Sequence, residues 1–183
     1  MVYSYEEIRD KGYSNYQLQK LVDNNKLVKI KPGIYSTKKE YSLVEVVVKE
    51  YKNFVTTLDS ALYYYNLIKK EPTYYYLATT QKARKITNPL IKQTFMSENL
   101  YQLGVNIIKY QGVQVPAYDI ERLLIEVVRN KTKMDYAIYA EAINSYKKIS
   151  SLLNKRKLDQ YLLVFKDPKI QMRIENEIFM IGE

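Results

Sequence analysis

A short stretch near the N-terminus carries amide, hydroxyl and ammonium side chains along one expected helical face. Between Ser14 and Asn24, polar groups occupy the first turn and the positions opposite the apolar residues. These polar residues are Ser14, Asn15, Tyr16, Gln19, Lys20 and Asp23. Amide and lysine side chains are those that contact base edges and phosphates when a helix enters the major groove. The pattern predicts a DNA-reading helix, with Asp23 directed away from the phosphate backbone.

A group of cations follows on an expected β-hairpin. Residues 27–31 alternate as a strand does, and residues 32–35 read as a Pro-Gly turn followed by a second strand. The cations of this region are Lys29, Lys31, Lys38 and Lys39. Period-two spacing places the first two on one face of the strand, and the other two follow closely. We expect these ammonium groups to straddle a phosphate backbone.

Catalytic chemistry has little to draw on. The chain has no histidine and no cysteine, which removes the commonest zinc ligands, the usual general base and thiol nucleophiles. Glu50-Tyr51-Lys52 has the letters of a nuclease Glu-x-Lys triple, but it falls on an expected amphipathic helix and is interpreted as a solvated face. If the chain is an enzyme after all, a metal-dependent nuclease is the alternative, and Glu50 and Lys52 are its candidate residues. We expect no catalytic residue, no cofactor and no bound metal.

Asp119, Glu121 and Arg122 open another expected helix, and a structural role explains them better than a catalytic one. Asp119 is placed to cap the helix, Glu121 complements its positive end, and Arg122 can pair with a nearby acid.

Two short capped helices position the polar face. Ser4 and Ser14 each stand three residues before a Glu or a Gln, which is the spacing of a capping box. They open helices that end near Gly12 and Asn24, joined by a turn that contains glycine, which is the form of a helix-turn-helix. The inward stripe of the second helix consists of Leu18, Leu21 and Val22.

The net charge of +9 favours polyanionic partners: nucleic acid first, an acidic protein second and anionic lipid third. A second basic region lies in an expected loop and in later helices, and it comprises Lys82, Arg84, Lys85, Lys147, Lys148, Lys155, Arg156 and Lys157. Extra DNA contact, docking of an acidic protein surface and plain solvation of helix faces remain open for it. No window approaches the roughly 20 apolar residues of a membrane span, so we expect a cytoplasmic protein without a membrane partner.

The remaining elements predict helices, then a small sheet, then a helical C-terminal half. The expected helices are 42–53, 58–66, 135–147, 151–165 and 168–180, with a further helix capped by Asp119 whose apolar stripe runs from Ile120 to Val128. The expected strands are 73–79, 93–96, 105–110 and 113–115. We expect an α+β chain in which residues 1–40 form a winged helix-turn-helix and residues 41–183 form a mixed α/β domain.

Three segments resemble the AbiEi-type antitoxins of abortive-infection toxin–antitoxin systems, and together they cover nearly the whole chain. Residues 12–35, from Gly-Tyr-Ser to Pro-Gly-Ile-Tyr, resemble the family's winged helix. Residues 57–67 are similar to its "S-x-x-S-A-L-x-x-x-G-L" helix, and residues 113–126 to its segment with "D-x-E-R-T-L". Leu123 stands where the family has Thr, Glu126 where it has Asp, and Asn25 where Gly is common. The helix that usually precedes the helix-turn-helix is missing.

The resemblance implies an antitoxin that counteracts a nucleotidyltransferase-type toxin and represses its own operon. It further implies binding of double-stranded promoter DNA at inverted repeats, for which a dimer is one arrangement. Whether the toxin is bound directly, modified or opposed indirectly stays open. The alternative is a winged-helix transcriptional regulator with a partner- or ligand-sensing domain and no toxin.

Overall fold

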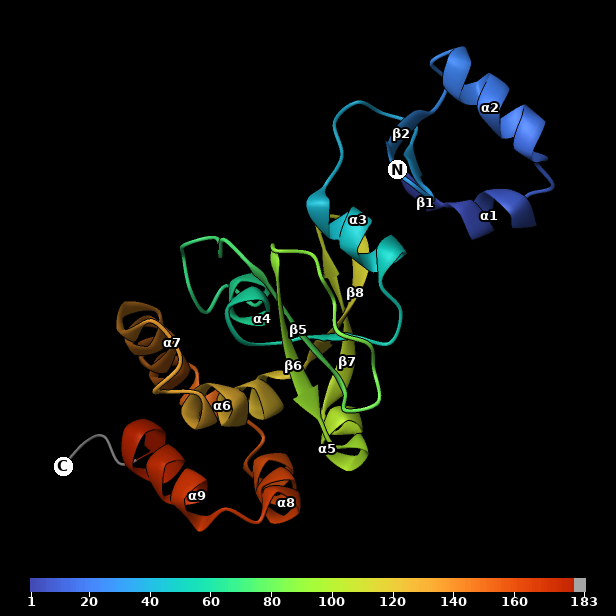
Figure 1. The fold of residues 1–183 in the computed structure, drawn as a ribbon. Helices are drawn as coiled ribbons and strands as arrows, with labels where there is room; N and C mark the ends of the chain where they lie inside the picture. Colours follow the sequence, from blue (N-terminus) through green and yellow to red (C-terminus); the bar gives the residue numbers. More distant parts are fainter. Residues whose placement is uncertain (180–183) are drawn as a thin grey trace. The chain divides into compact units, whose positions relative to one another are not determined.

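The computed structural model describes residues 1–179, which fold into two compact units (Figure 1). The first unit holds Met1–Asn53 and Gln111–Val113, and the second holds Phe54–Tyr110 and the chain from Gln114 onward. Each unit combines helices with a sheet, so the expected α+β class is confirmed at this level. No helix of the described chain is long and apolar enough to cross a membrane.

The first unit is a three-stranded antiparallel sheet with two helices before its hairpin and one after it. Its elements are β1 (Val2–Ser4), α1 (Tyr5–Asp10), α2 (Asn15–Asp23), β2 (Val28–Lys31), β3 (Ile34–Ser36) and α3 (Leu43–Glu50). The strand order is β1-β3-β2, so β3 is central. Both predicted capping boxes form: Ser4 and Ser14 each accept a hydrogen bond from the third helical N–H, and Glu7 and Gln17 bond back to them.

The two faces of this sheet are covered by different helices. Tyr35 packs with Ile8 of α1 and Leu18 of α2. Its neighbour Ile34 points to the opposite face, as alternation requires, and packs with Val46 of α3. The first unit therefore extends to Asn53, past the boundary predicted at residue 40, because α3 covers a sheet face that would otherwise be open to water.

A β-bulge interrupts the hairpin. Lys29 pairs with Tyr35, but Lys31 pairs with Ile34, so two steps along β2 match one step along β3. The bulge breaks the period-two alternation on which we placed both lysines on one strand face. The turn itself is as predicted, with Gly33 at a φ of 80° next to Pro32, a conformation that suits glycine.

The second unit is built on a five-stranded mixed sheet of order β6-β5-β4-β8-β7. Its strands are β4 (Val55–Thr56), β5 (Tyr75–Thr80), β6 (Ile91–Met96), β7 (Val105–Tyr110) and β8 (Val113–Tyr118). Its helical elements are α4 (Leu58–Tyr64), α5 (Glu98–Gln102), α6 (Ile120–Arg129), α7 (Tyr136–Lys148), the 3₁₀ turn η1 (Ser150–Leu152), α8 (Lys155–Phe165), α9 (Pro168–Ile174) and the π-helix η2 (Glu175–Phe179). The predicted last helix ended at residue 180, which lies outside the described residues.

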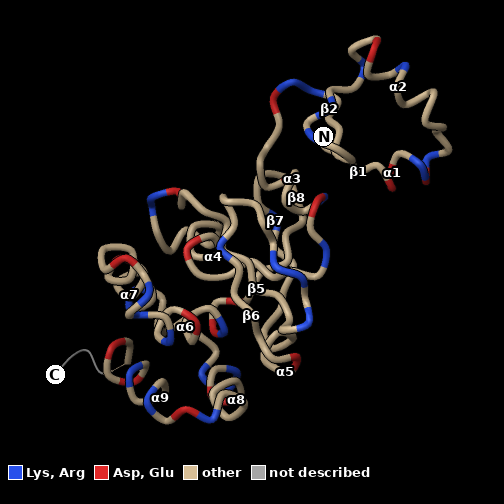
Figure 2. Tube along the Cα trace, in the orientation of Figure 1, with Lys and Arg blue, Asp and Glu red and all other residues tan. Residues whose placement is uncertain are grey.

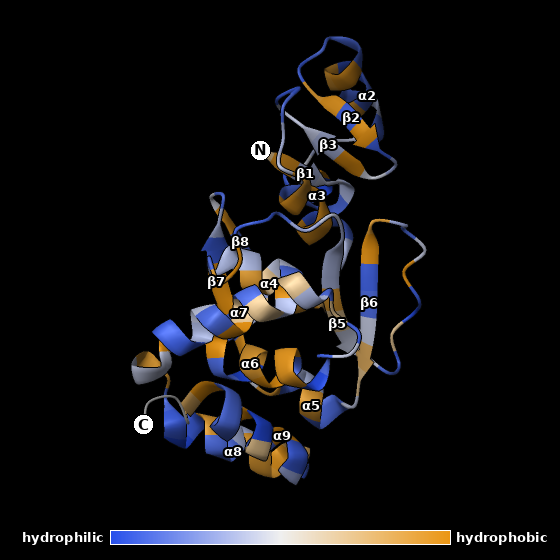
Figure 3. Cartoon of the chain, turned by 90° about the vertical axis from the view of Figure 1, so that its left-hand side faces the viewer, coloured by the Kyte–Doolittle hydropathy of each residue, from blue (hydrophilic) through white to orange (hydrophobic). Residues whose placement is uncertain are grey.

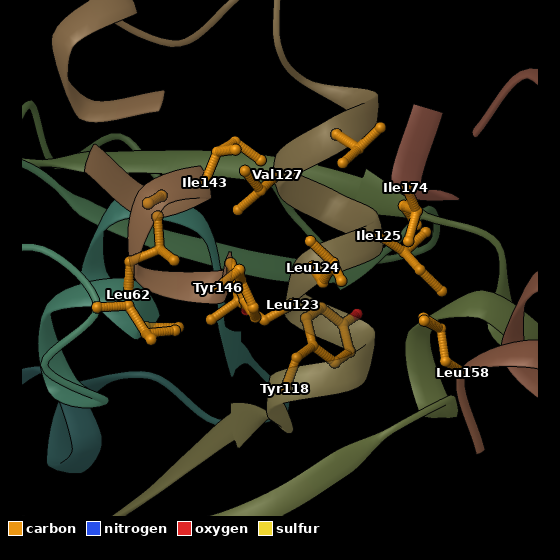
Figure 4. Close-up of a cluster of buried hydrophobic side chains, with 14 of the residues drawn as sticks. Leu62, Tyr118, Leu123, Leu124, Ile125, Val127, Ile143, Tyr146, Leu158 and Ile174 are labelled. Carbon is orange, nitrogen blue, oxygen red and sulfur yellow. The ribbon is translucent and has the colours of Figure 1, made fainter. Parts of the chain in front are cut away.

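Helix α6 is the centre of the second unit's core. Every residue from Glu121 to Val128 is buried, which is typical of a helix enclosed on all sides. Figure 4 shows its Leu124 and Val127 among side chains from other helices, including Leu62 of α4 and Ile143 of α7. In Figure 3 hydrophobic residues run along α6, whereas α8 carries hydrophilic residues on much of its surface.

The charged residues at the start of α6 have structural partners, as predicted. Asp119 accepts a hydrogen bond of 2.9 Å from the Arg122 N–H, which confirms the cap. The Arg122 side chain is fully buried, pairs with Glu126 and lies against the rings of Tyr118 and Phe165. Gly104 comes so close that a Cβ there would lie 2.5 Å from the Arg122 Cβ.

Candidate nucleic-acid interface

The face of α2 predicted to read DNA lies at the surface of the first unit. Of residues 14–24, Leu18 alone is buried and Leu21 and Val22 are half-buried, while all the others are exposed. Tyr16 is 69% exposed, a large fraction for an aromatic side chain. Anchorage through the apolar stripe thus leaves Asn15, Gln19 and Lys20 facing outward.

Each of these three side chains has a neighbour in the first unit. The Tyr5 hydroxyl donates a hydrogen bond of 2.6 Å to Oδ1 of Asn15, so the first turns of α1 and α2 are joined. The amide of Gln19 donates a bond of 2.8 Å to Asp23 one turn later. Lys20 lies over the ring of Tyr16, 4.9 Å from its centroid. Gln19 can therefore donate to a DNA base through this N–H only if its hydrogen bond to Asp23 breaks.

The first turn of α2 supplies backbone donors as well. Ser14 uses its side-chain oxygen to cap the Gln17 N–H. The first intrahelical bond runs from the Leu18 N–H to the Ser14 carbonyl. The N–H groups of Asn15 and Tyr16, in the first turn, have no acceptor within the helix and can bond to an external acceptor. An exposed helix N-terminus of this kind favours a phosphate group through its N–H groups and its dipole.

The hairpin lysines divide into two kinds. Lys29 is exposed and has no ion-pair partner among the described residues. Lys31 pairs with Glu50 of α3, so its charge is already compensated within the unit. Lys38 and Lys39 are exposed in the segment after β3, where the N–H of Lys38 bonds to the Ser36 hydroxyl. Of the four lysines predicted to bind phosphates, Lys29, Lys38 and Lys39 have no ion-pair partner in the described chain, and Lys31 has one.

Tyr5 connects the hairpin turn to α2. Its backbone N–H donates a bond of 2.7 Å to the carbonyl of Gly33, while its hydroxyl holds Asn15. The turn and the N-terminus of α2 are therefore positioned by one residue. Sequence reasoning missed Tyr5, although its place directly after the capping Ser4 marked it as the first residue of α1.

Three acidic residues of the first unit form ion pairs with lysines of the same unit. Glu6, Glu7 and Glu50 pair with Lys52, Lys49 and Lys31 respectively. Partial burial opposes ionisation of Glu7, but its hydrogen bonds to Lys49 and to the Ser4 backbone prevail, and the pKa of Glu7 is lowered. Glu50 and Lys52, which match a nuclease Glu-x-Lys triple in sequence, thus belong to two separate ion pairs. The described residues contain no cluster of acids that could hold a metal ion.

The second basic region separates into a loop and helix surfaces. Lys82, Arg84 and Lys85 lie exposed on the loop between β5 and β6. Lys148, Lys155 and Arg156 are exposed on α7 and α8, and Lys147 is half-buried. Lys157 differs because it pairs with Asp119 and Glu121. Partial burial would lower the pKa of Lys157, but its hydrogen bond to Asp119 and the charge of that carboxylate raise it. Its two ion pairs join α8 to the start of α6.

Comparison with known proteins shows the fold alone. No protein-family profile matches the chain, and no curated protein matches its sequence. The chain is similar to the crystal structure of the Rv2827c protein from Mycobacterium tuberculosis, with a TM-score of 0.62 and 12% sequence identity. The similarity covers 88% of this chain and 66% of the other. This chain therefore spans just under two thirds of that protein's length.

Proposed function

We propose that this chain is a DNA-binding antitoxin that represses its own operon and performs no chemistry of its own. The observation that carries the DNA-binding half is the outward face of α2. Asn15, Gln19 and Lys20 are exposed on a capped helix whose opposite side is anchored by Leu18. Groove recognition needs these features: polar groups on a rigid element, open backbone donors and cations beside them.

The arrangement around α2 supports a winged helix-turn-helix. The chain runs strand, helix, helix and hairpin, and α1 and α2 are joined by a short turn with Gly12 at a φ of 87°. In the proposed complex α2 enters the major groove, and Lys29, Lys38 and Lys39 contact the phosphate backbone. Helix α3 covers the face of the sheet opposite α1 and α2.

The antitoxin half of the proposal rests on the resemblance of the three segments to AbiEi-type antitoxins. On this proposal the partner is a nucleotidyltransferase-type toxin encoded by the adjacent gene, and the second unit opposes it. Asp119 and Arg122 carry part of the resemblance. Asp119 caps α6, and Arg122 is buried in the core of the second unit. We infer that these motif residues maintain the antitoxin body and do not act on a substrate.

Gel-shift titration with the DNA upstream of the gene tests the DNA-binding half. The triple variant Gln19→Ala, Lys20→Ala, Lys29→Ala should abolish the shift of the inverted repeats. A matched control is Gln160→Ala, Lys133→Ala, Lys169→Ala, which removes the same side-chain types from exposed positions of the second unit. Equal loss in both variants would show that total charge matters and not α2, and would overturn the assignment.

Co-expression with the adjacent gene tests the antitoxin half. The full chain should restore growth, and so should the triple α2 variant, since the proposal assigns neutralisation to the second unit. Failure of the full chain to protect cells from a toxic neighbour would remove the antitoxin function while leaving DNA binding intact.

One observation favours a second candidate, a ligand-sensing regulator without a toxin. A hollow of about 230 Å³ in the first unit is lined by Tyr3, Tyr13, Lys11 and Lys26, among others. An adjacent gene that proves harmless when expressed alone would favour this candidate.

A further inference from the structure

The loop between β5 and β6 is a cationic segment without any acid. Residues 72–97 include Lys82, Arg84, Lys85 and Lys92 and no Asp or Glu. None of these four cations has an ion-pair partner within the described chain, whereas Lys157 and Lys131 of the same unit are paired. In Figure 3 the loop runs outside β6, the edge strand of the sheet. In Figure 2 the charged residues along the loop are all basic.

A glutamine holds this loop in place. Oε1 of Gln93 accepts a hydrogen bond of 2.7 Å from the N–H of Ile86. Its amide nitrogen donates to the Arg84 carbonyl at 3.1 Å and to the Thr79 hydroxyl at 2.8 Å. The backbone that carries Arg84 and Lys85 is therefore fastened to β5 and β6 by one side chain. A fixed loop presents its charges without the ordering cost that a flexible loop would add on binding.

The same segment carries two exposed aromatic rings. Tyr74 is 37% exposed, and the ammonium group of Lys92 lies over its ring at 4.3 Å from the centroid. Phe95 is 44% exposed and shares a face of β6 with Gln93, the residue that holds the loop, whereas Lys92 points to the other face. Each face of the edge strand therefore carries one of the two rings. An exposed phenylalanine on an edge strand has no role in the core and offers a flat surface for stacking.

We propose that this surface, named here the β6 edge and comprising Lys82, Arg84, Lys85, Lys92, Tyr74 and Phe95, binds single-stranded RNA. Unpaired cations next to exposed rings are the combination that binds a single strand, since phosphates meet the charges and unstacked bases meet the rings. A duplex keeps its bases stacked and gains nothing from the rings. An acidic protein surface would use the charges but leave Tyr74 and Phe95 without a function.

This inference does not depend on the proposed function. It concerns residues of the second unit alone, whereas the proposed DNA contacts come from the first. A chain that binds RNA at the β6 edge and fails to bind its promoter, or the reverse, would separate the two.

Fluorescence anisotropy with a labelled oligouridylate of about 12 nucleotides tests the proposal on the full chain. The triple variant Lys82→Ala, Arg84→Ala, Lys85→Ala should weaken binding at least about tenfold and reduce the salt slope by roughly 0.7 for each lost phosphate contact. The matched control Lys69→Ala, Lys133→Ala, Lys169→Ala lowers the net charge equally at scattered exposed positions. It should bind nearly as the unchanged chain does.

Two charge-neutral variants separate a built site from general attraction. Gln93→Ala releases the loop and should weaken RNA binding several-fold without altering the charge. Tyr74→Leu with Phe95→Leu keeps apolar volume but removes the rings, and it should weaken RNA more than duplex DNA of equal length.

Four outcomes would overturn the proposal. These are no RNA binding by the unchanged chain at low salt, equal weakening by the loop and control triples, loss of RNA binding in the α2 variant instead, and tighter binding of polyglutamate than of RNA. Equal affinity for single-stranded DNA and RNA would correct the ligand to single strands in general.

Discussion

The ammonium group of Lys31 pairs with the carboxylate of Glu50, and this contact fastens the hairpin to α3. Lys29 stands two residues earlier on the same strand and has no such partner in the described chain. The bulge between them separates their roles, so that one lysine stabilises the unit and the other stays open to an external anion.

Lys29→Ala is therefore expected to weaken promoter binding and to lower the salt slope of the affinity by about 0.9, the value for one phosphate contact. Lys31→Ala should leave that slope unchanged and lower the stability of the chain by at most about 1 kcal/mol, because the pair is partly exposed to solvent. Titrations at several salt concentrations and urea unfolding measure both effects. Glu50→Gln is the informative control, since it frees Lys31 and should raise the slope. A slope that falls equally in both lysine variants would contradict the division.

Asp23 places a negative charge on the face of α2 and holds Gln19. Asp23→Asn keeps an oxygen acceptor for Gln19 but removes the repulsion of phosphates. We expect promoter affinity to rise about threefold, equivalent to roughly 0.6 kcal/mol. Anisotropy with duplex promoter DNA measures the change, and Asp159→Asn, at an exposed position of α8, serves as the control. An unchanged affinity would mean that Asp23 lies beyond the groove.

Arg122 and Glu126 form a buried ion pair inside the second unit. Arg122→Met alone should destabilise the chain by about 3–5 kcal/mol, because it leaves Glu126 buried with less compensation. The double variant Arg122→Met, Glu126→Leu should recover much of that loss, since Arg129 is partly exposed and can turn to water. Denaturant unfolding of the three proteins measures this. A double variant no more stable than the single one would show that the pair itself stabilises the fold.

Asp59 is a buried carboxylic acid at the start of α4, and its Oδ1 has no hydrogen-bond partner among the described residues. Burial raises the pKa of Asp59, and a hydrogen bond with Tyr76 opposes that effect only in part. A raised pKa in the folded state means that the folded chain holds this proton more tightly. Stability should therefore fall as the pH rises from the ordinary aspartate value of 3.8 toward the raised folded value.

Asp59→Asn should accordingly raise the melting temperature at pH 7 and have little effect near pH 3, where the native carboxyl is protonated in both states. Calorimetry across this range measures the difference. A variant that loses stability equally at both pH values would contradict this prediction. It would indicate that the Asp59 carboxyl stabilises the fold through its shape or hydrogen bonds, and that its charge does not destabilise the folded state.

The elements with strong local signals were predictable from the sequence. The capping residues Ser4, Ser14 and Asp119 marked helix starts that the structure confirms, and the turn at Gly33 was equally clear. Strands β1 and β4 were missed because segments of two or three residues show no periodicity. Helix α5 was missed for a similar reason, since its five residues complete little more than one turn.

The candidate site was predictable in part. The exposure of Asn15, Gln19 and Lys20 follows from helical periodicity, which is local. The pairing of Lys31 with Glu50 spans 19 positions of the chain and depends on where α3 packs. Likewise, no local pattern could show that Gln93 holds the loop of Arg84, because that contact arises only when β6 lies beside β5.

The position of α3 decides what can be separated from this chain. Val2 and Ile34 rely on Val46 for cover, so the leading forty residues are not a detachable cassette. A gene fusion that transplanted them alone would carry an uncovered apolar sheet face into its host and invite aggregation. Any transfer of α2 to another protein has to take strand β1 before it and helix α3 after it as one piece.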